Sequence, residues 1–298
     1  MEAKTVEVKE SGVSTCFEAF TFGKKEPSSP SVAFTAGIHG DEVTGVYVAQ
    51  KLIEMFENTP PQNGCVRIIP VVNATAMRCM QRRSPFDGED LNRIFPGKSG
   101  GSISHALAAA VYAQTDGFDM IVDLHCCSQY SAPYILSIYS EHERIRRLAN
   151  SITLPVALHS EGTPGQLFTE SCRRRAQAAL IIELPSGGGK GEVNTEVAGR
   201  CFAALRDMLC AYGFIDGEIR GAHPTFYGKM SDIEAPRAGL WQPCVSKCAT
   251  VPGGACLGTL DGQPVCAKED CFVLSIRAAA YIMPDELYLG AYIREEDA

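Results

Sequence analysis

The sequence lacks any apolar run of the roughly 18 residues that a membrane-spanning helix needs. Its first ten residues, Met-Glu-Ala-Lys-Thr-Val-Glu-Val-Lys-Glu, are charged and lack the apolar segment of a signal peptide. A basic surface for nucleic acid is not expected, since the formal net charge is -8. We therefore expect a cytoplasmic protein that binds neither a membrane nor nucleic acid.

A C-x-x-C motif is also missing, although the chain holds 13 cysteines. Without a signal peptide these thiols are expected to be reduced, and we interpret them as small hydrophobic side chains of the core. The weaker alternative is a structural zinc site near His223, built from cysteines that lie four or five residues apart: Cys244, Cys248, Cys266 and Cys271.

The composition is otherwise that of a globular protein, and the 298 residues suffice for one large domain or for a large and a small one. Up to residue 211, apolar strand-like segments alternate with segments of helical periodicity, which predicts an α/β domain with a largely parallel sheet between layers of helices. Predicted strands are 5–9, 16–22, 31–36, 65–72, 119–124, 134–139 and 180–184, and predicted helices are 43–56, 104–114, 141–151 and 193–211.

Four polar side chains stand at or just past the ends of predicted strands: His39, Asn73, His125 and Glu183. Ligands of such sheets bind outside the carboxyl ends of the strands, so we expect these side chains to converge there. Two of them have a plainer explanation when taken singly. His125 can be a satisfied histidine near the core, and Glu183 can be a buried acid that pairs with an arginine.

The turn Gly37-Ile-His39-Gly-Asp-Glu42 joins a predicted strand to a predicted helix. An imidazole and a carboxylate on one turn can bind Zn²⁺, although such a pair is often only a solvated surface pair. Together with His125 they make a His₂Glu set, which leaves one position for water and is typical of catalytic zinc. Glu183, in an apolar strand, is expected to have a raised pKa and to pass the proton of that water to the leaving amine.

The segment 82–97 is a long irregular loop that is rich in turn-forming residues. Long loops within compact domains are often functional, and guanidinium groups recognise carboxylates, although surface solvation explains such arginines equally well. We expect Arg82 or Arg83 to stabilise an oxyanion, and Asn92 and Arg93 to hold a substrate carboxylate.

Four motifs in this order resemble the succinylglutamate desuccinylase/aspartoacylase family, a branch of the zinc-carboxypeptidase-like hydrolases. They are G-x-H-G-D-E at 37–42, D-G-x-D-L-N-R-x-F-P-G at 87–97, D-L-H at 123–125 and I-E-L at 182–184. The resemblance spans about residues 31 to 190. It implies a three-layer α/β domain with a mixed, mostly parallel sheet, and one Zn²⁺ per chain held by the side chains of His39, Glu42 and His125.

The resemblance also implies roles for the remaining side chains. Glu183 corresponds to the general base and acid, and Asn92 and Arg93 correspond to the pair that binds the substrate carboxylate. Arg82 best matches the arginine that polarises the scissile carbonyl, with Arg83 as the alternative. Arg173 stands ten residues before Glu183, where aspartoacylases place an arginine for an acidic acyl group. An arginine run such as 173–175 is alternatively a solvated face. Asn73 completes the substrate-binding set at the strand ends.

After Gly213 short strands and frequent Gly or Pro indicate an all-β region. Residues 251–258 resemble residues 283–290, so we predict a catalytic domain over 1–214 and a small pseudo-symmetric β barrel or sandwich over 215–298. This region resembles the biotinyl/lipoyl-like fold. Its predicted hairpin at 260–264 lacks a lysine, which favours a structural module that shields the active-site cleft or makes a subunit contact in a homo-oligomer.

The sequence thus predicts a zinc-dependent amidohydrolase that removes the acyl group from an N-acyl amino acid or a similar small carboxylate. Two alternatives stay open: a metallocarboxypeptidase that acts on peptide C-termini with the same chemistry, and a non-catalytic binding module on a decayed hydrolase scaffold.

Overall fold

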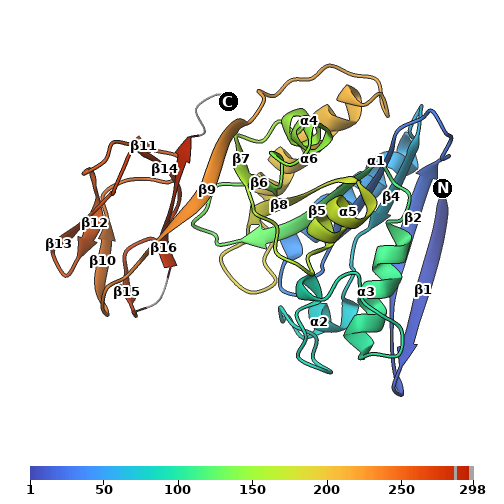
Figure 1. The fold of residues 1–298 in the computed structure, drawn as a ribbon, viewed down its shortest axis with the longest axis horizontal. Helices are drawn as coiled ribbons and strands as arrows, with labels where there is room; N and C mark the ends of the chain where they lie inside the picture. The colour runs from blue at the N-terminus through green and yellow to red at the C-terminus, as the bar shows by residue number, and fades with distance from the viewer. Residues whose placement is uncertain (285–286, 295–298) are drawn as a thin grey trace.

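The computed structural model describes residues 1–284 and 287–294. It consists of an α/β body and a smaller β-rich body formed by the C-terminal residues (Figure 1). Strand β9 (Thr225–Glu234) joins them, because it pairs with β7 (Val156–His159) of the first body and with β16 (Leu287–Arg294) of the second. The predicted domain boundary at residue 214 lies in the connection between the last helix and β9.

The α/β body is built on a mixed sheet with strand order β1-β2-β4-β3-β5-β8-β6-β7-β9. Its central neighbours β4, β3, β5 and β8 are all parallel, while β1–β2, β2–β4 and β8–β6 are antiparallel. The predicted largely parallel sheet is therefore correct for the centre. The bounds are β1 (Glu2–Glu10), β2 (Val13–Gly23), β3 (Ser31–Ala36), β4 (Cys65–Ile69), β5 (Met120–Cys127), β6 (Tyr134–Ser137) and β8 (Ala178–Pro185).

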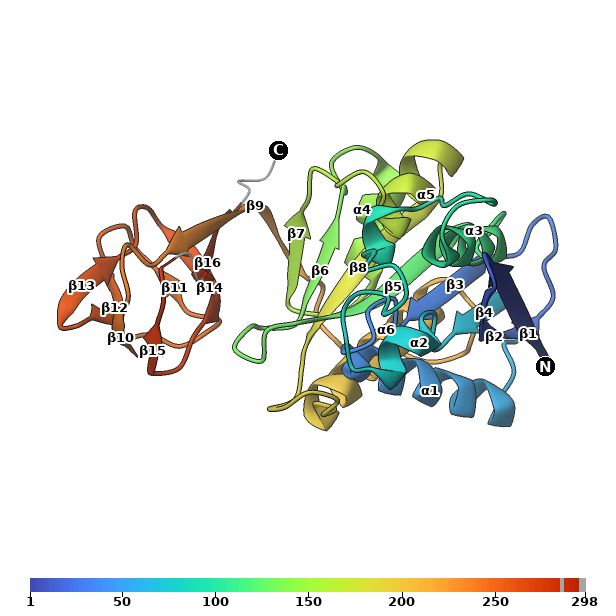
Figure 2. The ribbon, with the colours of Figure 1, turned by 90° about the horizontal axis from the view of Figure 1, so that it is seen from below.

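Helices cover both faces of this sheet. Helices α1 (Val43–Asn58) and α6 (Thr195–Ala211) pack together on one face, and α3 (Ile103–Gln114) and α5 (Leu167–Arg175) lie on the other (Figure 2). Helix α4 (Glu143–Ser151) contacts β8 and α6. Two short elements follow β4, the helix α2 (Ala74–Arg78) and the 3₁₀ turn η1 (Leu91–Arg93).

The central strands are buried on both faces, which is why they are nearly continuous apolar runs in the sequence. Every residue of β3 is buried. Helix α1 approaches β5 closely at Gly45, where a Cβ atom would lie 2.9 Å from the carbonyl oxygen of Leu124. The carboxyl ends of β3, β5 and β8 are thereby fixed beside one another at one edge of the sheet.

The described residues of the C-terminal region form only β-strands and loops, as predicted. A four-stranded sheet of order β13-β12-β10-β15 packs around its own hydrophobic cluster, in which Trp241 is 2% exposed. The remaining strands extend the large sheet. The bounds are β10 (Gly239–Pro243), β11 (Thr250–Val251), β12 (Cys256–Leu260), β13 (Gln263–Cys266), β14 (Cys271–Ile276) and β15 (Ala280–Ile282).

The predicted hairpin without lysine is present, since Leu260 pairs with Gln263 across the two-residue turn Asp261-Gly262. Both turn residues have positive φ, as a tight hairpin requires. The second copy of the predicted internal repeat includes residues 285–286, which lie outside the described residues. A barrel or sandwich of biotinyl/lipoyl-like form stays a prediction.

Several sequence-based expectations need correction. His125 lies inside β5 rather than after its end, because this strand continues to Cys127. All thirteen cysteines are free, as expected, but six are exposed, so their interpretation as core side chains is wrong for those six. Within the described residues no cysteine group is arranged for a metal.

No helix among the described residues is long and apolar enough to cross a membrane.

Candidate active site

The turn after β3 carries His39 and Glu42. It passes so close to α2 that a Cβ atom at Gly40 would overlap the backbone of Ala76, and Gly37 adopts a φ of +65°. Glycine at these positions lets the turn fold back against α2. Glu42 precedes α1 directly, yet its carboxylate makes no capping hydrogen bond and points instead toward two imidazole rings.

His39, Glu42 and His125 converge as predicted. Glu42 Oε1 lies 2.7 Å from His39 Nδ1, and Glu42 Oε2 lies 2.8 Å from His125 Nδ1. The two ring centroids are 4.9 Å apart. One donor atom from each residue lies within 4.8 Å of the other two, and within the described part of the chain no other group of three such side chains does so. All three side chains are buried.

Two further carboxylates hold the outer nitrogens of the rings. Asp90 Oδ1 lies 3.0 Å from His39 Nε2, and Asp123 Oδ2 lies 2.9 Å from His125 Nε2. Zinc-binding histidines commonly donate their second N–H to a carboxylate, which fixes the ring and directs the other nitrogen to the ion. The donor set and this outer arrangement together fit Zn²⁺ bound through both Nδ1 atoms and Glu42.

Asp90 and Asp123 are two site residues that were not predicted from the sequence. Asp123 stands two residues before His125 on the same strand, and alternate strand residues share one face of a sheet, so this contact was recoverable from the spacing. Asp90 belongs to the second motif, whose loop must fold back onto the first turn to bring it to His39. No local pattern predicts that contact.

The cluster is strongly polarised. Burial opposes the charge on His125, but Asp123 and Glu42 outweigh it and raise the pKa of the imidazole well above its ordinary value. Burial likewise opposes ionisation of Glu42, yet His125 and His39 hold the pKa of this carboxyl below its ordinary value. A divalent cation would stabilise a buried carboxylate that is flanked by two imidazoles. The cation would then supply the positive charge that ring protons supply without it.

Glu183 lies beside this cluster, because residues His125 and Glu183 are partners in the β5–β8 register. Its side chain is partly buried. Burial raises its pKa to about 7, and the charge of Glu42 adds to this shift while His125 opposes it. No arginine forms an ion pair with Glu183 among the described residues, so the plainer explanation of a paired acid does not hold.

The two candidate arginines occupy different places. Arg82 borders the cluster, with Nη1 3.3 Å from Glu42 Oε1 and Nε 3.1 Å from Asp90 Oδ2. Arg83 is exposed and donates to the carbonyl oxygen of Gly88. The geometry therefore favours Arg82 over Arg83 as the arginine at the reacting group.

Asn92 is buried between the cluster and α5. Its Oδ1 accepts a hydrogen bond from the N–H of Leu167 at 3.0 Å, and its Nδ2 lies 3.4 Å from His125 Nε2. Arg93 follows on η1 with an exposed side chain, and its Nη1 donates to the carbonyl oxygen of Asn92 at 2.8 Å. Asn92 thus contacts the cluster of His39, Glu42 and His125, and Arg93 follows it on the same turn.

Asn73 lies against the first turn, because its N–H donates to the carbonyl oxygen of Gly37 at 2.9 Å. Its Oδ1 accepts from the N–H of Ala76 and so caps α2. The buried Nδ2 has no hydrogen-bond partner among the described residues. Asn73 therefore supports the wall of the site and leaves the N–H groups of its amide unused.

Arg173 makes no hydrogen bond or ion pair with this cluster among the described residues. Helix α5 begins beside Asn92 at Leu167, and Arg173 follows six residues later, about 9 Å along the axis at the rise of an α-helix. Its guanidinium pairs with Glu141 at 2.6 Å and donates to the carbonyl oxygens of Glu161 and Gly162. None of these contacts joins Arg173 to the cluster, and its role in binding an acidic acyl group stays a prediction.

Fold and site together define an α/β protein with a candidate mononuclear metal centre at the carboxyl edge of its sheet. The family model "Succinylglutamate desuccinylase/Aspartoacylase catalytic domain" matches residues 28–209. The chain belongs to this family.

Individual proteins are similar over most of the chain. The N-alpha-acetyl-L-2,4-diaminobutyric acid deacetylase of Halomonas elongata is 27% identical over 235 residues, which cover 74% of this chain and 68% of that protein. An aspartoacylase family protein of Mesorhizobium loti has a TM-score of 0.82 at 23% identity over 99% of this chain and 95% of that one. The ectoine utilization protein EutE (DoeB) of Ruegeria pomeroyi has a TM-score of 0.80 at 19% identity over 98% and 95%.

Proposed function

We propose that this protein is a zinc-dependent amidohydrolase that deacylates an N-acyl amino acid or a similar small carboxylate. The observation that carries the proposal is the convergence of His39, Glu42 and His125 beside Glu183 at one edge of the sheet. The similarity to a deacetylase of an N-acetylated amino acid supports the substrate class.

In this proposal one Zn²⁺ is held by the side chains of His39, Glu42 and His125. When bound, zinc supplies a Lewis acid that polarises a carbonyl group and makes water more acidic. The outer carboxylates of Asp90 and Asp123 keep the two rings in the orientation that this requires.

Glu183 acts as the general base and acid. With its pKa near neutrality, its carboxylate can accept the proton of the attacking water and then return it to the leaving amine. Arg82 at the rim places positive charge where the carbonyl oxygen gains negative charge. Asn92 and Arg93 hold the carboxylate of the substrate, and the unused amide N–H groups of Asn73 are available to a polar group of the substrate.

The C-terminal region closes one side of this site in our proposal. Residues 128–132, which follow β5 and its His125, contact it directly. Lys247 Nζ donates to the carbonyl oxygen of Ser131 at 2.8 Å. The N–H of Ala132 donates to the carbonyl oxygen of Leu274 at 2.9 Å. A module docked here restricts the room for a peptide chain, which favours small substrates over peptide C-termini.

The test is turnover by zinc-loaded protein of N-acetyl-, N-succinyl- and N-formyl-amino acids beside short peptides. We expect release of the free amino acid from at least one N-acyl amino acid and slower turnover of peptides. Turnover of peptides alone would contradict the proposal in favour of a carboxypeptidase, and no turnover of any of them would favour a binding module.

A further inference from the structure

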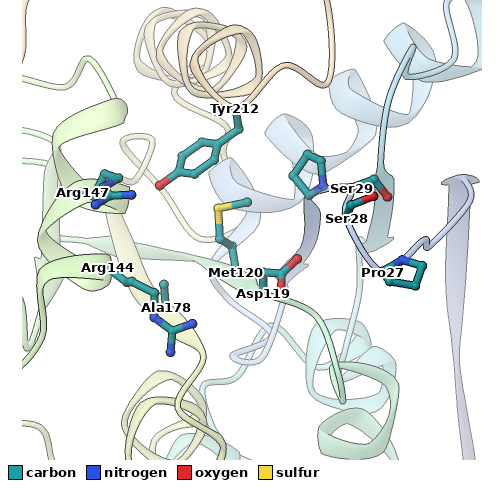
Figure 3. A pocket seen from close by; sticks show the side chains of 10 residues that line it. Pro27, Ser28, Ser29, Asp119, Met120, Arg144, Arg147, Ala178 and Tyr212 are labelled. Carbon is teal, nitrogen blue, oxygen red and sulfur yellow. The ribbon is translucent and has the colours of Figure 1, made fainter.

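A cavity lies at the opposite edge of the sheet from the cluster of His39, Glu42 and His125. Its volume is about 420 Å³, and Met120 and Ala178, the first residues of β5 and β8, form part of its floor (Figure 3). On the same strands His125 and Glu183 come five residues later, about 17 Å away at the rise of a β-strand. A molecule in this cavity therefore cannot touch the reacting groups.

One wall of the cavity is positively charged. Arg144 and Arg147 stand three residues apart on α4 and so share one side of that helix. Arg144 Nη2 donates to the carbonyl oxygen of Ala176 at 2.6 Å, which holds this guanidinium near the start of β8. Tyr212 turns its hydroxyl group toward Arg147 (Figure 3). Neither arginine forms an ion pair within the described part of the chain.

The facing wall carries one carboxylate and two hydroxyl groups. Asp119 Oδ2 accepts hydrogen bonds from the N–H and the Oγ of Ser31, at 2.9 and 2.6 Å. Its Oδ1 accepts none from the described residues. Ser28 and Ser29 complete this wall on the loop before β3. Asp119 is thus held by one oxygen and presents the other to the cavity.

The remaining lining is apolar, and its volume lies within the range of sites for small molecules. The cavity therefore combines an apolar floor with two guanidinium groups on one side and one carboxylate on the other. Guanidinium groups hold carboxylates, and a carboxylate holds an ammonium group. A phosphate group would gain from the arginines but would be repelled by Asp119.

We propose that this cavity is a binding site for a small acidic amino acid. The carboxylates of the ligand pair with Arg144 and Arg147, and its ammonium group pairs with Asp119. The single net negative charge of such a ligand complements the single net positive charge of the three side chains. This proposal rests on the lining of the cavity alone and is independent of the proposed function.

The test is calorimetric titration of L-glutamate into wild-type protein and into Arg147→Ala, which removes an exposed side chain. We expect binding to weaken roughly tenfold or more, the loss typical of one charge-assisted hydrogen bond. Arg200→Ala is the matched control, because it removes an exposed arginine of α6 outside the cavity and should bind as wild type does.

The variant Arg93→Ala separates this cavity from the active site. L-glutamate bound in the cavity keeps its affinity in Arg93→Ala. Binding that persists in Arg147→Ala but disappears in Arg93→Ala would place the ligand in the active site and overturn the proposal. No detectable binding of L-glutamate to wild-type protein at about 10 mM would overturn it as well.

Three further probes test the charge pattern. Glutarate lacks the ammonium group and L-norvaline lacks the second carboxylate, so each should bind more weakly than L-glutamate. Glutarate binding as tightly as L-glutamate would exclude a role for Asp119. Inorganic phosphate binding more tightly than L-glutamate would show a phosphate site in place of an amino acid site.

Discussion

At the scale of single residues, the candidate site is organised by its outer carboxylates. Asp90 and Asp123 each hold the far nitrogen of one imidazole, so both Nδ1 atoms face the same small volume beside Glu42. Without these contacts each ring would be free to rotate about its χ2 angle. The preorganisation of the site therefore depends on two residues that do not belong to the set of proposed zinc ligands.

Asp123→Asn tests this dependence. The amide cannot match the charge of the buried carboxylate beside His125, and we expect zinc affinity to fall roughly 10- to 100-fold, as for other outer-shell changes. Competition with a chelator measures the affinity. The control Asp116→Asn removes an exposed carboxylate that pairs with Arg175, and it should leave the zinc affinity unchanged. Equal affinities of the two variants would show that Asp123 does not orient a zinc ligand.

Glu183→Gln tests the general base. The amide cannot accept the proton of the attacking water, so kcat should fall by roughly 10²-fold or more while zinc content stays at the wild-type level. A variant with full zinc and unchanged turnover would remove Glu183 from the mechanism.

The pH dependence of wild-type turnover follows from the same group. In the proposed mechanism Glu183 acts as a base only when it is ionised, so kcat should fall as the pH falls through its pKa. Burial places this pKa at about 7, and a bound cation would favour the ionised form and lower it. We therefore expect the acid limb at or below pH 7 in the zinc-loaded enzyme, and its disappearance in Glu183→Gln. An unchanged acid limb in this variant would assign it to another group.

At the scale of elements, the strand–turn–helix unit β3–α1 was well predicted, and the reason is physical. A buried parallel strand must be a continuous apolar run, and the helix after it shows an apolar stripe at helical spacing. The predicted strand over residues 31–36 has the observed bounds, and the helix begins at Val43 as expected.

Other parts of the site could not be predicted from local pattern. Helix α5 holds three consecutive arginines and has no clean apolar stripe, and it was missed. It matters for the site because the N–H of Leu167 fixes the side chain of Asn92. The contact between Asp90 and His39 spans 51 residues and depends on how a whole loop folds, which no local periodicity encodes.

The turn that carries His39 is fixed by its contact with α2, and Gly40→Ala tests this. The new methyl group would overlap the backbone of Ala76, so we expect a loss of at least roughly 1–3 kcal/mol in the free energy of unfolding. Gly199→Ala is the matched control in α6, where the added methyl group meets nothing within 4 Å. It should gain about 0.5–1 kcal/mol from lower chain entropy. Chemical denaturation measures both, and equal effects would show that α2 does not restrain the turn.

Asp207 of α6 ties the segment after this helix to the body. Its carboxylate accepts from Thr153 Oγ1 at 2.7 Å and from the N–H groups of Gly221 and Arg220. Burial opposes ionisation, but these hydrogen bonds outweigh it and lower the pKa of Asp207. Since the pKa of Asp207 is lower in the folded state, its carboxylate contributes to the free energy of unfolding above the unfolded pKa of about 3.9. This contribution is lost as the pH falls through the pKa of the folded state.

We therefore expect Asp207→Ala to unfold more easily at pH 7, by roughly 1–3 kcal/mol. The difference from wild type should shrink as the pH falls below about 3.9. Denaturation midpoints measured across this pH range check the prediction, and a difference that grows at low pH would contradict it.

At the scale of the whole molecule, one sheet edge carries the candidate active site and the opposite edge carries the cavity lined by Arg144, Arg147 and Asp119. Strands β5 and β8 connect them, because they begin at Met120 and Ala178 and reach His125 and Glu183. The sheet also continues through β9 into the C-terminal region. Composition predicted the all-β character of that region but not this continuity, because strand pairing between distant segments leaves no trace in composition.

The central claim is that distant segments of the chain build one zinc site, and metal content tests it most directly. Elemental analysis of purified, zinc-loaded protein should find one zinc per chain in the wild type and in His223→Ala, a control whose imidazole contacts only the carbonyl oxygen of Asn150 among the described residues. His125→Ala should fold, as judged by circular dichroism, and should lose both zinc and activity. A folded His125→Ala protein with full zinc, or a wild-type protein that retains none, would contradict the account.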